Sequence, residues 1–357
     1  MKLPGRRKSV VLRRCAIFLL HRSGYYLRKL SEGSRRRALV LVYHKVGDGS
    51  RGAPDGTWRA GFERGIARDR FESHMRFLRD VMHPIPLTEL AERVRQGEHP
   101  PPGSIAVTFD DGYRDNFTRA HPILMKHRIP ATIFVATAFI ESKEVFWWDR
   151  VYDLFRRTKE HDLDLARVPP LAARVRDLAH TRLSLSTPRR RILSAEAVIG
   201  MMESSSPDSL ENALAALRNA LRVTESEPTS FDPTLTWGQI EEMSRRGISI
   251  ESHTHTHPFL SSLSPERVEE ELHTSRAILE QRTGRKVYGL AYPGGRAGMY
   301  TDTTMSGARR AGYRYACVAE PGDVGSDSDP FAIRRVPVGD EPISALAHRL
   351  LSAYRLT

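Results

Sequence analysis

Two adjacent carboxylates, Asp110 and Asp111, follow the apolar run 105–107, which has the composition of a short buried β-strand. Gly112 comes next and permits the sharp turn at which a strand gives way to a loop. Neighbouring carboxylates repel each other and resist desolvation, so their position at a strand end favours a bound cation. A strand-end aspartate pair also occurs in phosphatases and in plain turns, so this feature alone leaves the chemistry open.

A second polar cluster lies about 140 residues further along the chain. His253, His255 and His257 occupy alternate positions just after the short strand predicted over 247–250. One carboxylate and two neutral imidazoles form a three-ligand site for a divalent metal, with a fourth position open to water. The spare carboxylate would then be available as a base. The alternative is that the three histidines line a solvated strand edge.

Together, the two clusters resemble the signature motifs of the NodB-type polysaccharide deacetylases, carbohydrate esterase family four. Residues 108–112 read Thr-Phe-Asp-Asp-Gly, and residues 253–258 match the pattern His-Ser/Thr-x-x-His-Pro. The resemblance implies a distorted (β/α)7 barrel and an α/β fold class. It also implies site roles: Asp111, His253 and His257 bind a divalent metal, Zn²⁺ by preference, and Asp110 is the catalytic base.

The division of labour between the two aspartates agrees with elementary chemistry. A carboxylate bound directly to a cation is a poor proton acceptor, whereas its neighbour can accept a proton from water. Zinc lowers the pKa of such a water to about 7. For His255, which lies between the two expected ligands, we predict a structural role or a contact with a ligand rather than metal binding.

A third motif, at residues 290–295, departs from the family pattern. The resemblance implies that the backbone N–H of Tyr292, in Tyr-Pro-Gly-Gly, stabilises the oxyanion of the tetrahedral intermediate. This chain reads Leu290-Ala291-Tyr292-Pro293 where the family has Arg-x-Pro-Tyr, so the arginine that normally orients the base is missing from its expected place. Arg296, Arg334 and Arg335 are candidates for that task, and the sequence does not select among them.

The general acid has two candidates. His44 ends an apolar strand, and its place resembles the permuted arrangement of exopolysaccharide (poly-N-acetylglucosamine) deacetylases, in which this histidine comes first in the chain. As an imidazolium it could protonate the leaving amine; the alternative is a capping or core histidine. Leu346-Ala347-His348 matches the family's Leu-x-His letters but lies in a predicted helix, 344–354. We therefore predict His44 as the acid.

The run Phe146-Trp147-Trp148-Asp149 follows the strand predicted over 131–136 and should lie at the same end of the barrel. Aromatic faces stack on the C–H faces of sugars, so these residues could line a glycan groove. The alternative is that they anchor the following segment to the barrel, which is the role we expect for Trp147, while both roles stay open for Trp148 and Asp149.

Strand and helix patterns alternate over most of the chain, which predicts parallel β/α architecture. Residues 151–231 differ, because they carry helical periodicity without a further strand-like run. We therefore expect a basic N-terminal arm, 1–37, and one deacetylase domain, 38–357, with its motifs from about residue 104 and an α-helical insertion at about 151–231. In parallel barrels the active site lies at the carboxyl ends of the strands, where all the predicted site residues fall.

The charge is concentrated in the arm. Residues 1–37 hold twelve Lys/Arg and one acid, a net charge of +11 of the chain's +12. The longest apolar run, 15–20, is too short for a signal core or a spanning helix. The arm could form an amphipathic helix on an anionic membrane or a short packing helix. We predict a cytoplasmic location, peripheral to the inner membrane, with export by another route left open.

The composition is ordinary for a globular protein, with 40% apolar and 27% charged residues among 357. The two cysteines are far apart and imply no disulfide framework. No nucleic-acid partner is expected, because no nucleic-acid-binding fold accompanies the basic cluster.

The predicted function is metal-dependent removal of N-acetyl groups from amino sugars of a glycan, with release of acetate. The alternatives are deacetylation of a lipid-linked or O-acetylated sugar, and a non-catalytic glycan-binding module on the same fold.

Overall fold

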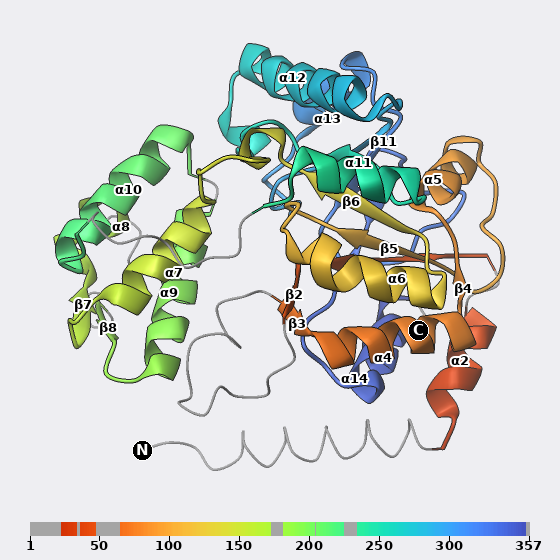
Figure 1. Cartoon of the computed structure of the whole chain (residues 1–357), viewed down its shortest axis with the longest axis horizontal. Coiled ribbons are helices and arrows are strands. Elements are labelled where there is room, and N and C mark those ends of the chain that lie inside the picture. Colours follow the sequence, from red (N-terminus) through yellow and green to blue (C-terminus); the bar gives the residue numbers. More distant parts are fainter. Residues whose placement is uncertain are drawn as a thin grey trace.

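The computed structural model describes residues 23–33, 36–47, 65–172, 181–203, 205–224 and 234–354 (Figure 1). Predictions for the rest of the chain lie outside the described residues; of the amphipathic helix considered for the arm, over residues 10–27, only 23–27 are described. Among the described helices, none combines the length and the apolar character needed to cross a bilayer.

A parallel sheet curls into a nearly closed barrel, as the sequence predicted. Within the described residues it has nine strands in the order β12-β11-β10-β9-β6-β5-β1-β13, with β4 beside the start of β5. The strands are β1 (Leu39–Tyr43), β4 (His83–Pro84), β5 (Ser104–Phe109), β6 (Ala131–Val135), β9 (Ser249–Ser252), β10 (Gly289–Ala291), β11 (Tyr315–Val318), β12 (Ile333–Arg334) and β13 (Val336–Pro337). The strands β1, β5, β6 and β11 are buried along their whole length, as expected for apolar runs covered on both faces.

The barrel closes through one short segment that pairs on both sides. Ile333 and Arg334 pair with β11, and Val336 and Pro337 pair with β1. Arg335 lies at the break between β12 and β13. These two short strands together fill the last strand position of the barrel. Counting them as one, the described strands of the ring occupy the seven positions of a (β/α)7 barrel.

Helices cover the outside of the barrel. They are α4 (Arg68–Val81), α5 (Leu87–Arg95), α6 (His121–His127), α11 (Trp237–Arg245), α12 (Pro265–Thr283), α13 (Asp302–Arg310) and α14 (Ile343–Ala353). The longest of them has a clear start and end: the Ser264 side chain caps α12, Pro265 opens it, and Gly284 ends it with a φ of 65°. A π-turn, Asn116–Ala120, precedes α6, and the short parallel pair β2 (Lys45–Gly47) and β3 (Gly65–Ala67) extends the chain after β1.

The described end of the basic arm forms α2 (Tyr25–Gly33), which packs against α14. Tyr26 and Leu30 are buried there, and the Tyr26 hydroxyl lies 3.2 Å from the His348 ring. This part of the arm is therefore a packing helix on the barrel.

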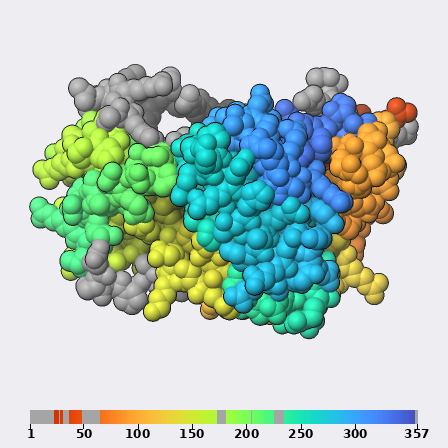
Figure 2. Space-filling model, turned by 90° about the horizontal axis from the view of Figure 1, so that it is seen from above, coloured from red at the N-terminus to blue at the C-terminus, as the bar shows by residue number. Residues whose placement is uncertain are grey.

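The described residues from α7 to α10, between β6 and α11, form a lobe beside the barrel (yellow to green in Figures 1 and 2). Its helices are α7 (Trp147–Arg157), α8 (Pro169–Ala172), α9 (Pro188–Met202) and α10 (Pro207–Ala220), packed around a hydrophobic core of their own. An antiparallel pair, β7 (Asp162–Asp164) and β8 (Arg182–Ser184), also lies here, which the expectation of purely helical structure over 151–231 did not include. Each of these strands has only three residues, too few to give a periodic signal. The remaining short turns of 3₁₀ helix are 137–139, 165–167 and 260–262.

Candidate active site

A cavity of about 130 Å³ opens at the carboxyl ends of the barrel strands, between the barrel and the lobe. The barrel lines it with Val42, His44, Asp110, Asp111, His253, His257, Phe259, Gly294, Arg296, Met299, Ala319 and Pro337, and the lobe adds Trp147, Trp148 and Glu203. Most of the site residues predicted from the sequence line this one cavity.

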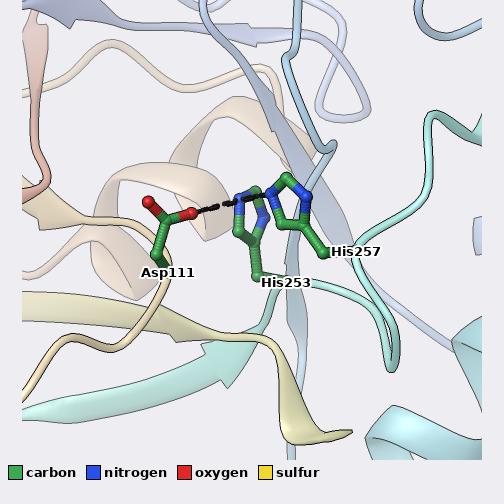
Figure 3. Close-up of side chains that lie close together, drawn as sticks. All are labelled: Asp111, His253 and His257. Atoms are coloured by element: carbon green, nitrogen blue, oxygen red, sulfur yellow. Dashed lines mark hydrogen bonds and ion pairs between the residues drawn. The ribbon is translucent and has the colours of Figure 1, made fainter. Parts of the chain in front are cut away.

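Asp111, His253 and His257 converge in this cavity (Figure 3). Their ligand atoms all lie within 4.8 Å of one another, with 3.1 Å between the two histidine Nε2 atoms and 3.6 Å from each Nε2 to Asp111 Oδ1. A tetrahedral zinc ion with bonds of about 2.0–2.1 Å needs ligand atoms about 3.3 Å apart. The three side chains therefore fit a divalent cation between them.

The protonation of the histidines suits metal binding. His253 Nδ1 lies 2.7 Å from the carbonyl oxygen of Ala291, so Nδ1 carries the hydrogen and Nε2 keeps its lone pair for a metal. Burial lowers the pKa of His253, and burial together with its neighbour His253 holds the pKa of His257 well below its usual value. Both rings are therefore neutral, as ligands must be.

The backbone at this centre is unusual. Asp111, Thr254 and His257 have φ values of 74°, 68° and 60°, in the left-handed region that residues other than glycine rarely occupy. Gly112, with a φ of 76°, is required, because a Cβ there would lie 2.9 Å from Val135 Cγ1. The turn after β5 thus depends on Gly112 in two ways: the residue adopts a left-handed φ, and it has no side chain to clash with Val135.

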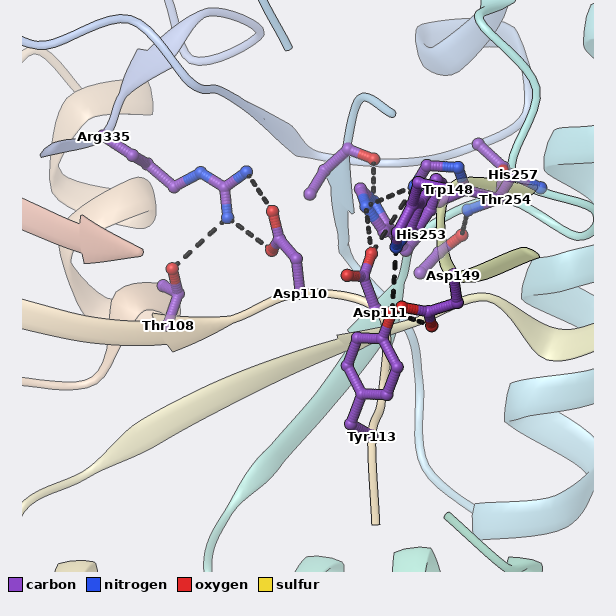
Figure 4. A network of polar contacts seen from close by, with 12 residues as sticks. Thr108, Asp110, Asp111, Tyr113, Trp148, Asp149, His253, Thr254, His257 and Arg335 are labelled. Carbon is purple, nitrogen blue, oxygen red and sulfur yellow. Dashed lines mark hydrogen bonds and ion pairs between the residues drawn. The ribbon is translucent and has the colours of Figure 1, made fainter. Parts of the chain in front are cut away.

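Asp110, unlike Asp111, has an arginine as its partner (Figure 4). Arg335 Nη1 and Nη2 donate to the two carboxylate oxygens of Asp110 at 2.6 and 2.8 Å, and Nη1 also lies 3.3 Å from Thr108 Oγ1. Burial opposes ionisation of Asp110, but the charge of Arg335 outweighs it and brings the pKa of Asp110 to about 2. Of the three arginines that the sequence left open, the structure therefore selects Arg335 as the partner of Asp110. Arg296 instead pairs with Glu203 at 2.9 Å.

The two candidate acids lie in different places. His44 follows β1 and lines the cavity, and Asn116 Nδ2 donates to its carbonyl oxygen at 2.8 Å. His348 is on α14 against Tyr26 and is absent from the cavity lining. His255 is outside the triad as well, because its Nδ1 lies 2.8 Å from Thr137 Oγ1.

The structure does not support the role expected for Tyr292. Its backbone N–H donates to the Cys317 carbonyl at 3.1 Å, continuing the ladder between β10 and β11, and its side chain is buried away from the cavity lining. An N–H engaged in this ladder is not free to bind an oxyanion. Gly294, two residues further on, lines the cavity, and a Cβ at this position would lie 2.4 Å from Met299 Sδ.

A buried polar network supports the site from the lobe side, and sequence reasoning identified only part of it. Asp149 accepts a hydrogen bond from the Tyr113 hydroxyl at 2.8 Å and pairs with Lys45 Nζ at 3.3 Å. Trp148 Nε1 donates to the Tyr113 hydroxyl at 3.0 Å, and Lys45 Nζ lies 4.0 Å from the centre of the Tyr113 ring. Trp148 and Asp149 therefore anchor the start of α7, and Trp148 lines the cavity together with the half-buried Trp147. No local pattern marked Lys45, which acquires its partners only through the fold.

Fold and site together define a β/α barrel with a candidate metal centre. The polysaccharide deacetylase family pattern matches residues 97–176 and 207–316, more than half of the chain, so the protein belongs to this family. The described residues between the two matched ranges, 181–203 and 205–206, lie in the lobe and include β8 and α9.

Individual relatives agree with this assignment. The Bacillus subtilis (strain 168) protein YxkH, named for the polysaccharide deacetylases, is 22% identical over 300 residues, covering 84% of this chain and 70% of YxkH. The structure of the Streptococcus pyogenes deacetylase PplD in complex with acetate matches with a TM-score of 0.56 and 18% identity, over 90% of this chain and 99% of PplD. IcaB from Ammonifex degensii matches with a TM-score of 0.54 and 20% identity, over 88% of this chain and 97% of IcaB. At these identities the structural matches establish the barrel fold.

Proposed function

We propose that the protein is a divalent-metal-dependent hydrolase that removes the N-acetyl group from an amino sugar of a glycan and releases acetate. The observation that carries this proposal is that one cavity contains two carboxylates with different partners. Asp111 lies with His253 and His257, while Asp110 is bound by Arg335. A module that only bound glycan would need neither a metal triad nor a separately oriented carboxylate.

Asp111, His253 and His257 would hold the metal, with Zn²⁺ preferred for this nitrogen and oxygen donor set. When bound, zinc would supply a Lewis acid that lowers the pKa of water and polarises the amide carbonyl. Asp110 accepts the proton of the attacking water, and Arg335 keeps its carboxylate ionised and oriented. The water oxygen bonds to the carbonyl carbon, the C–N bond breaks, and His44 donates a proton to the departing nitrogen.

Gly294 replaces Tyr292 as the proposed oxyanion donor. It lines the cavity, and its N–H donates to no acceptor among the described residues. A backbone N–H aimed at a developing oxyanion typically accelerates acyl transfer by about 10²–10³. A φ of 73° and the close approach of Met299 and Phe259 disfavour a side chain at this position.

The lobe supplies the proposed sugar-binding wall. Trp147 adds an aromatic surface to the cavity, and the Arg296–Glu203 ion pair joins the barrel to the lobe at the same cavity. Apolar ring faces suit the C–H faces of a sugar, and the ion pair offers both a donor and an acceptor to hydroxyl groups.

Acetate release tests the function. The substrates to compare are chitooligosaccharides, a lipid-linked N-acetyl sugar and an O-acetylated sugar, each with the wild type and Asp110→Asn. Asp110-dependent release of acetate from chitooligosaccharides supports the proposal. Preference for the lipid-linked or the O-acetylated sugar would assign that sugar as the substrate instead. Glycan binding without release from any of them would identify a binding module.

The basic arm supports a membrane-peripheral, cytoplasmic location. Its net charge of +11 favours contact between residues 1–37 and anionic lipid headgroups. Co-sedimentation of the full chain should be strong with phosphatidylglycerol vesicles, weak with phosphatidylcholine vesicles, and lost at high salt. Equal binding to both vesicles would argue against this contact.

A further inference from the structure

The loop that carries both histidines of the triad is anchored by a carboxylate from outside the sequence motifs. Glu271, on α12, accepts the backbone N–H groups of His255 and Thr256 on its Oε2 atom at 2.9 and 2.8 Å. Its Oε1 atom accepts the Thr256 hydroxyl. Glu271 is only 5% exposed, so a buried carboxylate is dedicated to this loop.

The loop has a conformation that needs such support. Thr254 and His257 both have left-handed φ values, which neither residue favours in isolation. Internal hydrogen bonds support them in part, since His257 N donates to Thr254 Oγ1 at 3.1 Å. The positions of the His253 and His257 rings therefore depend on how firmly the residues between them are held.

The same face of α12 makes a second contact to this strand end. Ser275, one helical turn after Glu271, lies 2.8 Å from Ser252 through the two hydroxyls. Backbone hydrogen bonds from Thr137 and Ala138 hold the opposite side of the loop. Those bonds remain if Glu271 is replaced, so the loop can stay folded while its geometry relaxes.

We infer that Glu271 is a positioning residue that sets the metal affinity of the Asp111–His253–His257 site. The inference rests on the proposed function of this triad as a metal centre. Glu271 contacts no ligand side chain, and acts by fixing the two backbone N–H groups between the histidines. Groups that orient metal ligands from outside the coordination sphere typically change metal affinity by about 10–100-fold when removed.

The test compares Glu271→Ala with Glu270→Ala, its neighbour on the exposed face of α12, where Glu270 pairs with Arg267. The Kd for Zn²⁺ is measured by competition with a chelating dye, alongside circular dichroism and thermal unfolding in chelator. We expect Glu271→Ala to raise the Kd by about 10–100-fold and Glu270→Ala to leave it within about twofold. At saturating Zn²⁺ the kcat of Glu271→Ala should recover to within a few-fold of the wild type.

Glu271→Gln keeps the volume of the side chain and one carbonyl acceptor, and it serves if the alanine variant does not fold. Its Kd for Zn²⁺ should rise by about 3–10-fold, because the charge-assisted bonds are lost. A folded Glu271→Ala or Glu271→Gln whose Kd equals that of the wild type would overturn the inference and leave the proposed function intact. A wild-type protein that binds no zinc would overturn both.

Discussion

Arg335 binds Asp110 with both arms of its guanidinium, from the point at which β12 gives way to β13. The arginine is fully buried, and the carboxylate it holds lies next to Asp111 of the triad. Closure of the barrel therefore brings the positive charge to the proposed base. This links the fold directly to the chemistry, because the break in the last strand is also the position of the orienting residue.

Arg335→Lys should lower kcat by about 10–100-fold, because an ammonium cannot reproduce the two parallel bonds. Weaker stabilisation of the carboxylate should also raise the pKa of Asp110, so the acid limb of the kcat/KM profile should move to higher pH. The pH–rate profile between pH 4 and 9 checks the fall in kcat, and its extension below pH 4 checks the shift, because the pKa of Asp110 in the wild type is about 2. Arg334→Lys, one residue earlier, is the control; an equal loss in the control would count against the assignment.

His44→Gln should lower kcat by about 10²–10⁴-fold, the usual contribution of a general acid. His348→Gln should change it by less than about twofold, because that ring lies on α14 against Tyr26. Steady-state acetate release at saturating Zn²⁺ distinguishes them. If the two substitutions had equal effects, His44 would not be the acid.

Trp147→Ala should raise KM by about tenfold for chitooligosaccharides with little change in kcat, because stacking holds the sugar without contacting the reacting bond. Leu193→Ala is the control within the lobe and should leave KM unchanged, because Leu193 is 54% exposed on α9 and does not line the cavity. A loss confined to kcat would assign Trp147 to catalysis instead and contradict the proposed sugar wall.

His74 should make the stability of the protein depend on pH. It is buried between the Tyr43 hydroxyl and the Glu341 carbonyl, and burial lowers its pKa to about 4. The unfolded chain takes up a proton near pH 6.5 and the folded chain does not, so stability is lost as the pH falls from about 6.5 to 4. The loss should be about 3 kcal/mol.

Denaturant titrations of the wild type and His74→Gln across this pH range measure that dependence. The variant should have a flatter profile than the wild type, whereas His83→Gln, at an exposed position on β4, should keep the wild-type slope. Parallel profiles for the wild type and His74→Gln would show that His74 is not the residue responsible.

The sequence could predict that Asp111, His253 and His257 come together, because each of them lies in a short motif at a strand end. Asp110 and Asp111 directly follow β5, and His253 directly follows β9, so their meeting required only the parallel barrel. The partner of Asp110 could not be predicted in this way. Arg335 is 225 residues away, and its contact depends on which residue falls at the break in the closing strand.

The role of Tyr292 is a second feature that the sequence could not predict. Its letters resemble the family motif, but the register between β10 and β11 decides which backbone N–H is used within the sheet. Register depends on pairing between distant strands, so a local motif could not reveal that Tyr292 is engaged and that Gly294 lines the cavity. The same reason hid Lys45 and Glu271, whose partners are distant in the chain.

The most direct test of the central claim is bound zinc measured together with acetate release from chitooligosaccharides, for the wild type and Asp110→Asn. We predict about one zinc per chain in both proteins, with release by the wild type and a loss of at least about 10³-fold in the variant. Zinc binding with equal release by both proteins would contradict the role of Asp110. Absence of bound zinc from a folded wild type, with release unaffected by chelator, would contradict the metal centre itself.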